Sequence, residues 1–214
     1  MKSLSPASAM VLTFTLAVAP LLVAAKSRRP QAAERELPPA VKTFGEKGAP
    51  ITMEVFSDFQ CPACRDLYLG VWRSLMDNYV ATGKVYLVHR YVVFPTHAYS
   101  RVATRYAEAA GRIGKFERVV DALFTKQETW SQSGDVDGVV AAVLTPAQMS
   151  KVRQLVKTGQ LDATIEKDVA LGQSRRVTQT PTTIIACKGQ TYPIVGVVSY
   201  PVLRQFLDQL LSQR

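Results

Sequence analysis

The sequence predicts an α/β fold in which a helical block separates a β-α-β unit from a β-β-α unit. Three observations indicate it: an apolar run before a long helical pattern, about eighty residues of further helical spacings, and two β-rich runs near the C-terminus. At 214 residues and 47% hydrophobic content, the chain can bury one core that carries such an insertion.

The first strand is expected at 51–57. This run is short, mostly apolar and bounded by Pro50 and Asp58, which is typical of a strand buried on both faces. A second buried strand is expected at 84–94, a stretch rich in valine, tyrosine and leucine that ends before Pro95.

Between these strands we expect a helix that begins at Pro62 and is stopped by Gly83. Its apolar residues recur at helical spacing in one wide stripe: Leu67, Tyr68, Val71, Trp72, Leu75, Met76 and Tyr79. Strand, helix and strand together predict a parallel βαβ unit, whose crossover is right-handed in nearly all known cases.

Residues 97–176 are expected to form the helical insertion. Three groups of apolar residues in it fall at helical spacings: Val102, Tyr106 and Ala109; Phe116, Val119, Val120, Leu123 and Phe124; and Val139, Val140, Val143 and Leu144. Thr145 and Pro146 predict the start of another helix, as N-cap and first-turn proline, and Gly159 predicts its end. One more helix is expected at 161–171.

The C-terminal part predicts a hairpin and a closing helix. Two β-rich runs, 182–187 and 190–198, flank Lys188-Gly189, which is a turn signal. Residues 200–211 carry an amphipathic helical pattern.

Residues 1–25 predict export, either as a signal peptide or as an N-terminal membrane anchor. The apolar stretch 9–25 follows Lys2 and ends in small residues that suit signal peptidase. Its length lies at the lower edge for a spanning helix and basic residues follow it, so both modes stay open. We expect a linker at 26–40, a folded domain at 41–214, and a periplasmic or extracytoplasmic location.

The charge balance does not favour nucleotide or nucleic-acid binding. Lysine and arginine total 26 against 17 acidic residues, a formal charge of +9, part of which lies in the N-terminal segment. The sequence shows no glycine-rich phosphate loop and no interleaving of aromatic and basic residues.

The motif Cys61-Pro62-Ala63-Cys64 directly follows the first strand. If Cys61 is the N-cap of the helix, its sulfur faces unpaired N–H groups and the positive end of the helix dipole, which favour the reactive thiolate. Cys64 returns about one turn later and can attack a mixed disulfide on Cys61. The motif therefore predicts thiol–disulfide exchange, with Cys64 the more buried and resolving cysteine.

Two other roles for the cysteine pair remain open. The pair could be half of a zinc or copper site, although only Cys187, His89 and His97 remain as soft ligands. A purely structural disulfide would close a very small loop and stabilise little. Cys187 itself is expected to be a small buried apolar residue, with a regulatory thiol as the alternative.

Thr180-Pro181 stands where the helical block returns to the sheet. A cis bond there would turn the chain sharply and leave neighbouring backbone groups free for a substrate strand. The alternative is a plain strand entry.

In combination, these motifs resemble the DsbA-like branch of the thioredoxin superfamily, the exported thiol:disulfide oxidoreductases. The match covers nearly the whole chain after residue 42. It runs through Phe44-Gly45, Gly48-Ala49-Pro50, residues 56–64, Phe94-Pro95, His97, Gly114-Lys115-Phe116, Ala122-Leu123-Phe124, Thr180-Pro181-Thr182, Gly189, Gly196 and Tyr200.

The resemblance implies a thioredoxin-like fold with a helical domain between its βαβ and ββα halves. It also implies that Cys61 and Cys64 are catalytic, that Thr180 and Pro181, with Pro62 and Ala63, contact substrate, and that no cofactor or metal is needed. The implied partners are unfolded or reduced secreted proteins and a membrane redox protein, DsbB-like or vitamin K epoxide reductase-like. The expected activity is disulfide formation; the alternatives are a reductase or isomerase, a non-catalytic folding helper and a metal-binding protein.

Departures from the family pattern bear on the oxidising power. Ala63 replaces the histidine that stabilises the thiolate in strong oxidants, so we expect a higher pKa at Cys61 and weaker oxidation. Glu54 is a candidate for the buried acid that assists the resolving cysteine, or else a solvated or salt-bridged glutamate. Asp58 is expected to be a turn residue, and His97 a helix-entry residue or a neighbour of the active-site face.

Val119 and Val120 stand where the family commonly has larger aromatic or polar residues. The resemblance therefore implies an altered groove beside the site.

Overall fold

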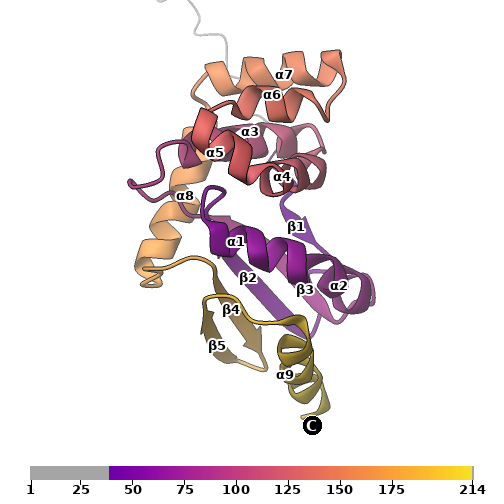
Figure 1. The fold of residues 1–214 in the computed structure, drawn as a ribbon. Helices are drawn as coiled ribbons and strands as arrows, with labels where there is room; N and C mark the ends of the chain where they lie inside the picture. Colours follow the sequence, from indigo (N-terminus) through magenta and orange to yellow (C-terminus); the bar gives the residue numbers. More distant parts are fainter. Residues whose placement is uncertain (1–38, 214) are drawn as a thin grey trace, which may run out of the picture. The chain divides into compact units, whose positions relative to one another are not determined.

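The computed structural model describes residues 39–213, in which five strands form one sheet in the order β1-β3-β2-β4-β5. Strands β2 and β3 are parallel, and the other neighbours are antiparallel. Figure 1 shows helices α3 to α7 gathered beyond one end of the sheet. The strands are β1 (Thr43–Phe44), β2 (Ile51–Ser57), β3 (Val85–Tyr91), β4 (Thr182–Cys187) and β5 (Gln190–Val195).

A long helix follows β2 and alternates between α-helical and π-helical turns. Its segments are α1 (Pro62–Leu67), η1 (Tyr68–Trp72), α2 (Arg73–Leu75) and η2 (Met76–Val80). Gly83 follows with a φ of 72°, a left-handed conformation that glycine adopts without a Cβ clash. The crossover therefore covers β2 and β3 with one continuous helical rod.

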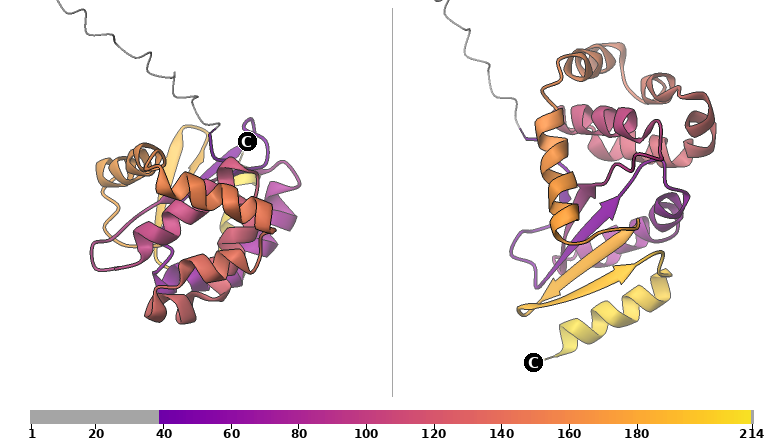
Figure 2. Two further views of the ribbon diagram at one scale, coloured as in Figure 1. Left: turned by 90° about the horizontal axis from the view of Figure 1, so that it is seen from above. Right: turned by 90° about the vertical axis from the view of Figure 1, so that its left-hand side faces the viewer.

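The helical block consists of α3 (Ser100–Arg112), α4 (Phe116–Thr125), α5 (Gln127–Ser133), α6 (Val136–Ala141), α7 (Pro146–Lys157) and α8 (Asp162–Ser174). Thr145 caps α7 through a capping box with Gln148, and Pro146 occupies the first turn. Figure 2 shows α8 running back alongside the sheet, which returns the chain to β4. The final helix is α9 (Tyr200–Ser212).

The sheet buries apolar side chains on both faces. On one face Met53 and Val55 join a large cluster with α1, η1, α4 and α9. On the other face Phe56 and Ile184 pack with Leu171 and Val177. Burial on both faces explains why β2 carries apolar side chains on each of them.

The predicted α/β fold with inserted helices is confirmed. Two elements were not predicted: β1, which has only two residues, and α5, whose sequence QETWSQS has no apolar periodicity. The hairpin turn at Lys188-Gly189 has positive φ at both residues, as a two-residue turn of type I′ requires.

Within residues 39–213, no helix has the length and apolarity that crossing a bilayer would need. The predicted export segment at 1–25 and most of the predicted linker at 26–40 lie outside the described residues.

Candidate active site

Cys61 is the N-cap residue of α1, in an extended conformation with φ −77° and ψ 121°. Its carbonyl oxygen accepts hydrogen bonds from the backbone N–H groups of Cys64 at 3.1 Å and Arg65 at 3.3 Å. Cys61 is half-buried and Cys64 is 2% exposed; both are free thiols. The difference in burial agrees with an outer, attacking thiol and an inner, resolving thiol.

The two thiols differ strongly in acidity. The hydrogen bond from Cys64 is the largest cause that lowers the pKa of Cys61 to about 5, and Thr180 and the N–H groups of Cys64 and Ala63 add to it. Burial opposes this change. For Cys64, burial together with the hydrogen bond and charge of Cys61 raises the pKa well above its ordinary value.

The low pKa of Cys61 arises without an imidazole between the cysteines. Ala63 contributes only its backbone N–H, and the inner thiol provides the main stabilisation of the thiolate. The low pKa agrees with the expected stabilisation of the Cys61 thiolate at the helix N-terminus, to which backbone and thiol donors contribute. That Ala63 leaves this pKa higher than a histidine would stays a prediction. Pro62 is exposed and Ala63 is half-buried.

The peptide bond between Thr180 and Pro181 is cis, and this segment lies opposite Cys61. The Cys61 Sγ lies 3.4 Å from the Thr180 carbonyl oxygen, across 119 positions of sequence. The Pro181 carbonyl oxygen accepts a hydrogen bond from the Gly196 N–H at 2.8 Å. The structure thus brings together Cys61, Cys64 and Thr180 as the sequence predicts.

Asp58 anchors the loop before the motif. Its carboxylate is fully buried and accepts hydrogen bonds from the N–H groups of Gln60 at 2.8 Å and Phe94 at 3.0 Å. His97 Nδ1 lies 3.0 Å from the same carboxylate, and the Asp58 N–H donates to Cys64 Sγ at 3.4 Å. Asp58 is therefore a turn residue, and His97 lies beside the active-site loop.

Glu54 does not join the cysteines. Its carboxylate pairs with Arg90, at 2.8 Å from Nε, and with Arg175 at 3.1 Å. Because side chains alternate along a strand, Glu54 points to the face opposite Val55, which packs with α1. The salt-bridged alternative is the one that the structure shows.

The remaining soft ligands are dispersed. Cys187 is buried, with Sγ 4.0 Å from the Leu210 carbonyl oxygen, and His89 lies among aromatic rings. Within residues 39–213, no three or more histidine, cysteine or acidic side chains are grouped to hold a metal ion.

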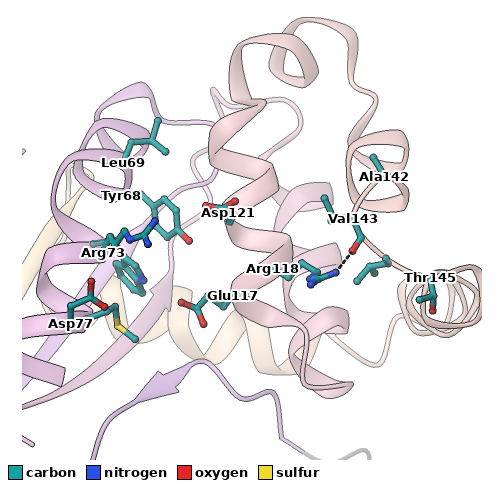
Figure 3. Close-up of a pocket in the computed structure, with 13 residues that line it drawn as sticks. Tyr68, Leu69, Arg73, Asp77, Glu117, Arg118, Asp121, Ala142, Val143 and Thr145 are labelled. Atoms are coloured by element: carbon teal, nitrogen blue, oxygen red, sulfur yellow. Dashed lines mark hydrogen bonds between the residues drawn. The ribbon is translucent and has the colours of Figure 1, made fainter. Parts of the chain in front are cut away.

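A cleft of about 1000 Å³ lies between the long helix and α4 (Figure 3). Its lining comes from Tyr68, Leu69, Trp72, Arg73, Met76, Asp77, Glu117, Arg118, Asp121 and residues 142–145. Neither the cysteine motif nor Thr180-Pro181 lines it, so it is separate from the thiols. Val119 and Val120 are buried in the core and do not line it either.

One residue at the site was missed by the sequence analysis. Gln127, the first residue of α5, donates hydrogen bonds to the carbonyl oxygens of Phe59 and Cys61. It lies in a stretch without apolar periodicity and far from the motif in sequence, so no local signal could have identified it.

A family model described as thioredoxin matches residues 39–193. Among solved structures, BdbD from Bacillus subtilis is similar with a TM-score of 0.67 and 20% identity, covering 82% of this chain and 96% of that chain. The alpha-DsbA1 of Wolbachia pipientis has a TM-score of 0.65, 17% identity and coverages of 79% and 89%. DsbA from Chlamydia trachomatis has a TM-score of 0.63, 18% identity and coverages of 79% and 91%. These likenesses show the fold.

A shorter match is to the Na(+)/H(+) antiporter NhaA 1 of Salinispora arenicola, with 34% identity over 83 residues. It covers 39% of this chain and 12% of the antiporter, so the chain spans a small part of that relative's length.

Proposed function

Because this chain belongs to the thioredoxin family, we propose that it is an exported thiol:disulfide oxidoreductase that forms disulfides in secreted proteins. The observation that carries the proposal is the opposite shift of two adjacent thiols: the pKa of Cys61 is lowered to about 5 while that of Cys64 is raised. One sulfur is then a nucleophile and leaving group at neutral pH, and the other stays protonated until it is needed.

In the proposed reaction, a substrate thiolate attacks Cys61 Sγ of the oxidised Cys61–Cys64 pair. The bond between the two cysteines breaks, and Cys64 leaves as a thiolate that takes up a proton. A second substrate thiolate then attacks the substrate sulfur and displaces Cys61 as its stabilised thiolate. Two electrons and two protons leave the substrate: the enzyme disulfide takes up both electrons, Cys64 takes one proton, and the other proton passes to solvent while Cys61 remains a thiolate.

Thr180, Pro181, Pro62 and Ala63 are proposed to contact the substrate. Thr180 supports this role because its carbonyl oxygen lies 3.4 Å from Cys61 Sγ. A peptide held there would place its cysteine against Cys61 by backbone hydrogen bonds, which do not depend on its sequence.

The proposed direction is oxidation, because a stabilised thiolate favours the reduced enzyme and so makes the disulfide form a stronger oxidant. Equilibration with glutathione redox buffers tests it. We expect a potential well above the roughly −270 mV of cytosolic thioredoxin. A value near that figure would instead support the reductase or isomerase alternative.

Replacement of Cys64 by Ser tests the enzyme assignment itself. Without the resolving thiol, Cys61 should accumulate as mixed disulfides with protein substrates, visible on non-reducing gels and by mass spectrometry. The Cys61→Ser variant should trap none, and Cys187→Ser should leave trapping by the Cys64→Ser chain unchanged. Failure of Cys64→Ser to accumulate any mixed disulfide would refute the proposal.

The location and partners are also proposals. The apolar stretch 9–25 supports an extracytoplasmic location, with reduced or unfolded secreted proteins as substrates. Turnover requires a disulfide-bearing oxidant, for which we propose a DsbB-like or vitamin K epoxide reductase-like membrane protein.

A further inference from the structure

One buried side-chain amide of the helical block, that of Gln127, hydrogen-bonds the backbone of the loop that carries Cys61. Gln127 is 3% exposed, and its Nε2 donates to the Phe59 carbonyl oxygen at 2.8 Å and to the Cys61 carbonyl oxygen at 2.9 Å. An amide nitrogen has two N–H donors, so both are used on the loop that carries the reactive thiol.

We propose that Gln127 is a positioning residue for thiol–disulfide exchange, which holds the Cys61 backbone so that its sulfur stays over the donors that stabilise the thiolate. This inference rests on the proposed function, since it assigns a role within the same site.

The chemistry of the Cys61–Pro62 peptide explains why an outside donor matters. Proline has no N–H, so the carbonyl oxygen is the only polar atom by which this peptide group can be held. The backbone N–H groups of Cys64 and Arg65 bond the same oxygen from within the helix, and Gln127 adds a bond from outside it. The orientation of this peptide group in turn determines the direction of the Cα–Cβ bond of Cys61, and so the position of its sulfur.

The thiolate depends on that orientation because two of its stabilising donors are the backbone N–H groups of Ala63 and Cys64. A small rotation at the N-cap would lengthen both contacts at once. Loss of the Gln127 bonds should therefore raise the pKa of Cys61.

A second glutamine forms a parallel connection from the loop side. Gln60 accepts from the Tyr99 N–H at 2.7 Å and donates to the Ser131 carbonyl oxygen at 3.4 Å. The loop is thus attached to α5 and to the N-cap residue of α3, and of the two glutamine side chains that of Gln127 hydrogen-bonds Cys61.

The test compares Gln127→Met and Gln127→Glu with Gln148→Met in the full chain. Methionine keeps the length of the side chain without a donor, and glutamate adds a negative charge. Gln148 supplies a matched control, because its amide also belongs to the helical block but bonds Thr145 in the capping box of α7. Foldedness is checked by circular dichroism.

The readout is the rate of alkylation of Cys61 as a function of pH, resolved from Cys64 and Cys187 by mass spectrometry. We expect the pKa of Cys61 to rise by about one unit in Gln127→Met, which is a tenfold loss of thiolate well below the pKa, and further in Gln127→Glu. Gln148→Met should leave it unchanged. An unchanged pKa in a folded Gln127→Met chain, or an equal rise in Gln148→Met, would overturn the proposal.

A measurement on the unaltered chain covers the case in which the variants do not fold. In heteronuclear NMR, the side-chain amide signals of Gln127 should shift with the ionisation of Cys61, while those of Gln148 should not. Absence of that response refutes the coupling. Neither test requires turnover, so a chain that exchanges no disulfides would refute the proposed function and leave the positioning role to be judged by these shifts.

Discussion

Polar groups on the two faces of strands β2 and β3 have different surroundings. On the face toward the long helix, His89 is 1% exposed, and neither ring nitrogen has a hydrogen-bond partner among the described residues. On the opposite face, Glu54 and Arg90 are ion-paired. His89 and Arg90 are neighbours on β3, yet the His89 ring lacks hydrogen-bond partners among the described residues while Arg90 is ion-paired.

The helix-side face is aromatic and apolar. The His89 ring stacks on Phe59 at 5.4 Å between centroids and meets Phe116 edge-on at 5.4 Å. Burial, with a smaller effect of the Lys42 charge, lowers the pKa of His89 to about 3, so the ring is neutral at physiological pH.

The opposite face continues into a charged network with α8. Asp168 is 4% exposed and accepts from Lys42, from Arg90 at 3.2 Å and from the Tyr91 N–H at 3.1 Å. Arg90 extends the network to Glu54.

The comparison shows where this protein tolerates charge. Charged groups on the α8 side of the sheet pair with Asp168, whereas behind the cysteines the buried Asp58 carboxylate is compensated by backbone N–H donors and His89 stays neutral. The inner thiol Cys64 belongs to the apolar cluster on the face toward the long helix, which is consistent with the rise of its pKa by burial.

The largest effect is expected from Asp168→Ala. It would leave the buried Lys42 ammonium without its carboxylate, and removing one partner of a buried pair typically costs about 3–5 kcal/mol. Denaturant unfolding measures this loss. Glu166→Gln, which removes an exposed partner of Arg101, should cost less than about 1 kcal/mol. If both variants lose the same free energy of unfolding, the buried network contributes no more to stability than an exposed ion pair, and the prediction fails.

His89→Phe should remove an acid sensitivity. Below pH 6.5 the unfolded chain protonates this histidine, but the folded chain does not until about pH 3, so stability falls by about 1.4 kcal/mol per pH unit in that window. We therefore compare the unfolding free energy of the variant with that of the unaltered chain at two pH values. This difference should favour the variant by about 3 kcal/mol more at about pH 4.5 than at about pH 7. Parallel stability curves for the two chains would contradict the neutral, buried histidine.

The smallest effect is expected at Cys61, because this half-buried group is partly exposed and solvent screens its interactions. Its pKa falls from an ordinary 9.0 to about 5 on folding, so the reduced form should gain stability relative to the oxidised form as pH rises from 5 to 9, and lose it below 5. Thermal melts of both forms across this range provide the check. In Cys61→Ser, which has no such thiolate, the stability curve should lack this rise with pH. A pH-independent difference between the oxidised and reduced forms would argue against the low pKa.

Features that depend on neighbours in sequence could be predicted from the chain. Thr145 and Pro146 mark a helix start because the cap bonds span three residues, and Cys61 to Cys64 fit one helical turn. Strand β1 could not be predicted, since its two residues are extended only through pairing with Val88 and Leu87.

Features that depend on contacts between distant parts of the chain could not be predicted from the sequence. Glu54 looked like a candidate acid until its partners Arg90 and Arg175 fixed its face. The backbone donors that lower the pKa of Cys61 follow from its N-cap position, whereas the contributions of the Cys64 and Thr180 side chains depend on the folded structure.

The site is assembled from segments that leave the ribosome at different times. Cys61 contacts Gln127 and Thr180, which lie 66 and 119 positions later in the chain. Until Thr180 has been synthesised and folded, Cys61 lacks one of the side-chain hydrogen bonds that lower its pKa. The thiolate of Cys61 therefore gains its full stabilisation only when the last third of the protein is in place.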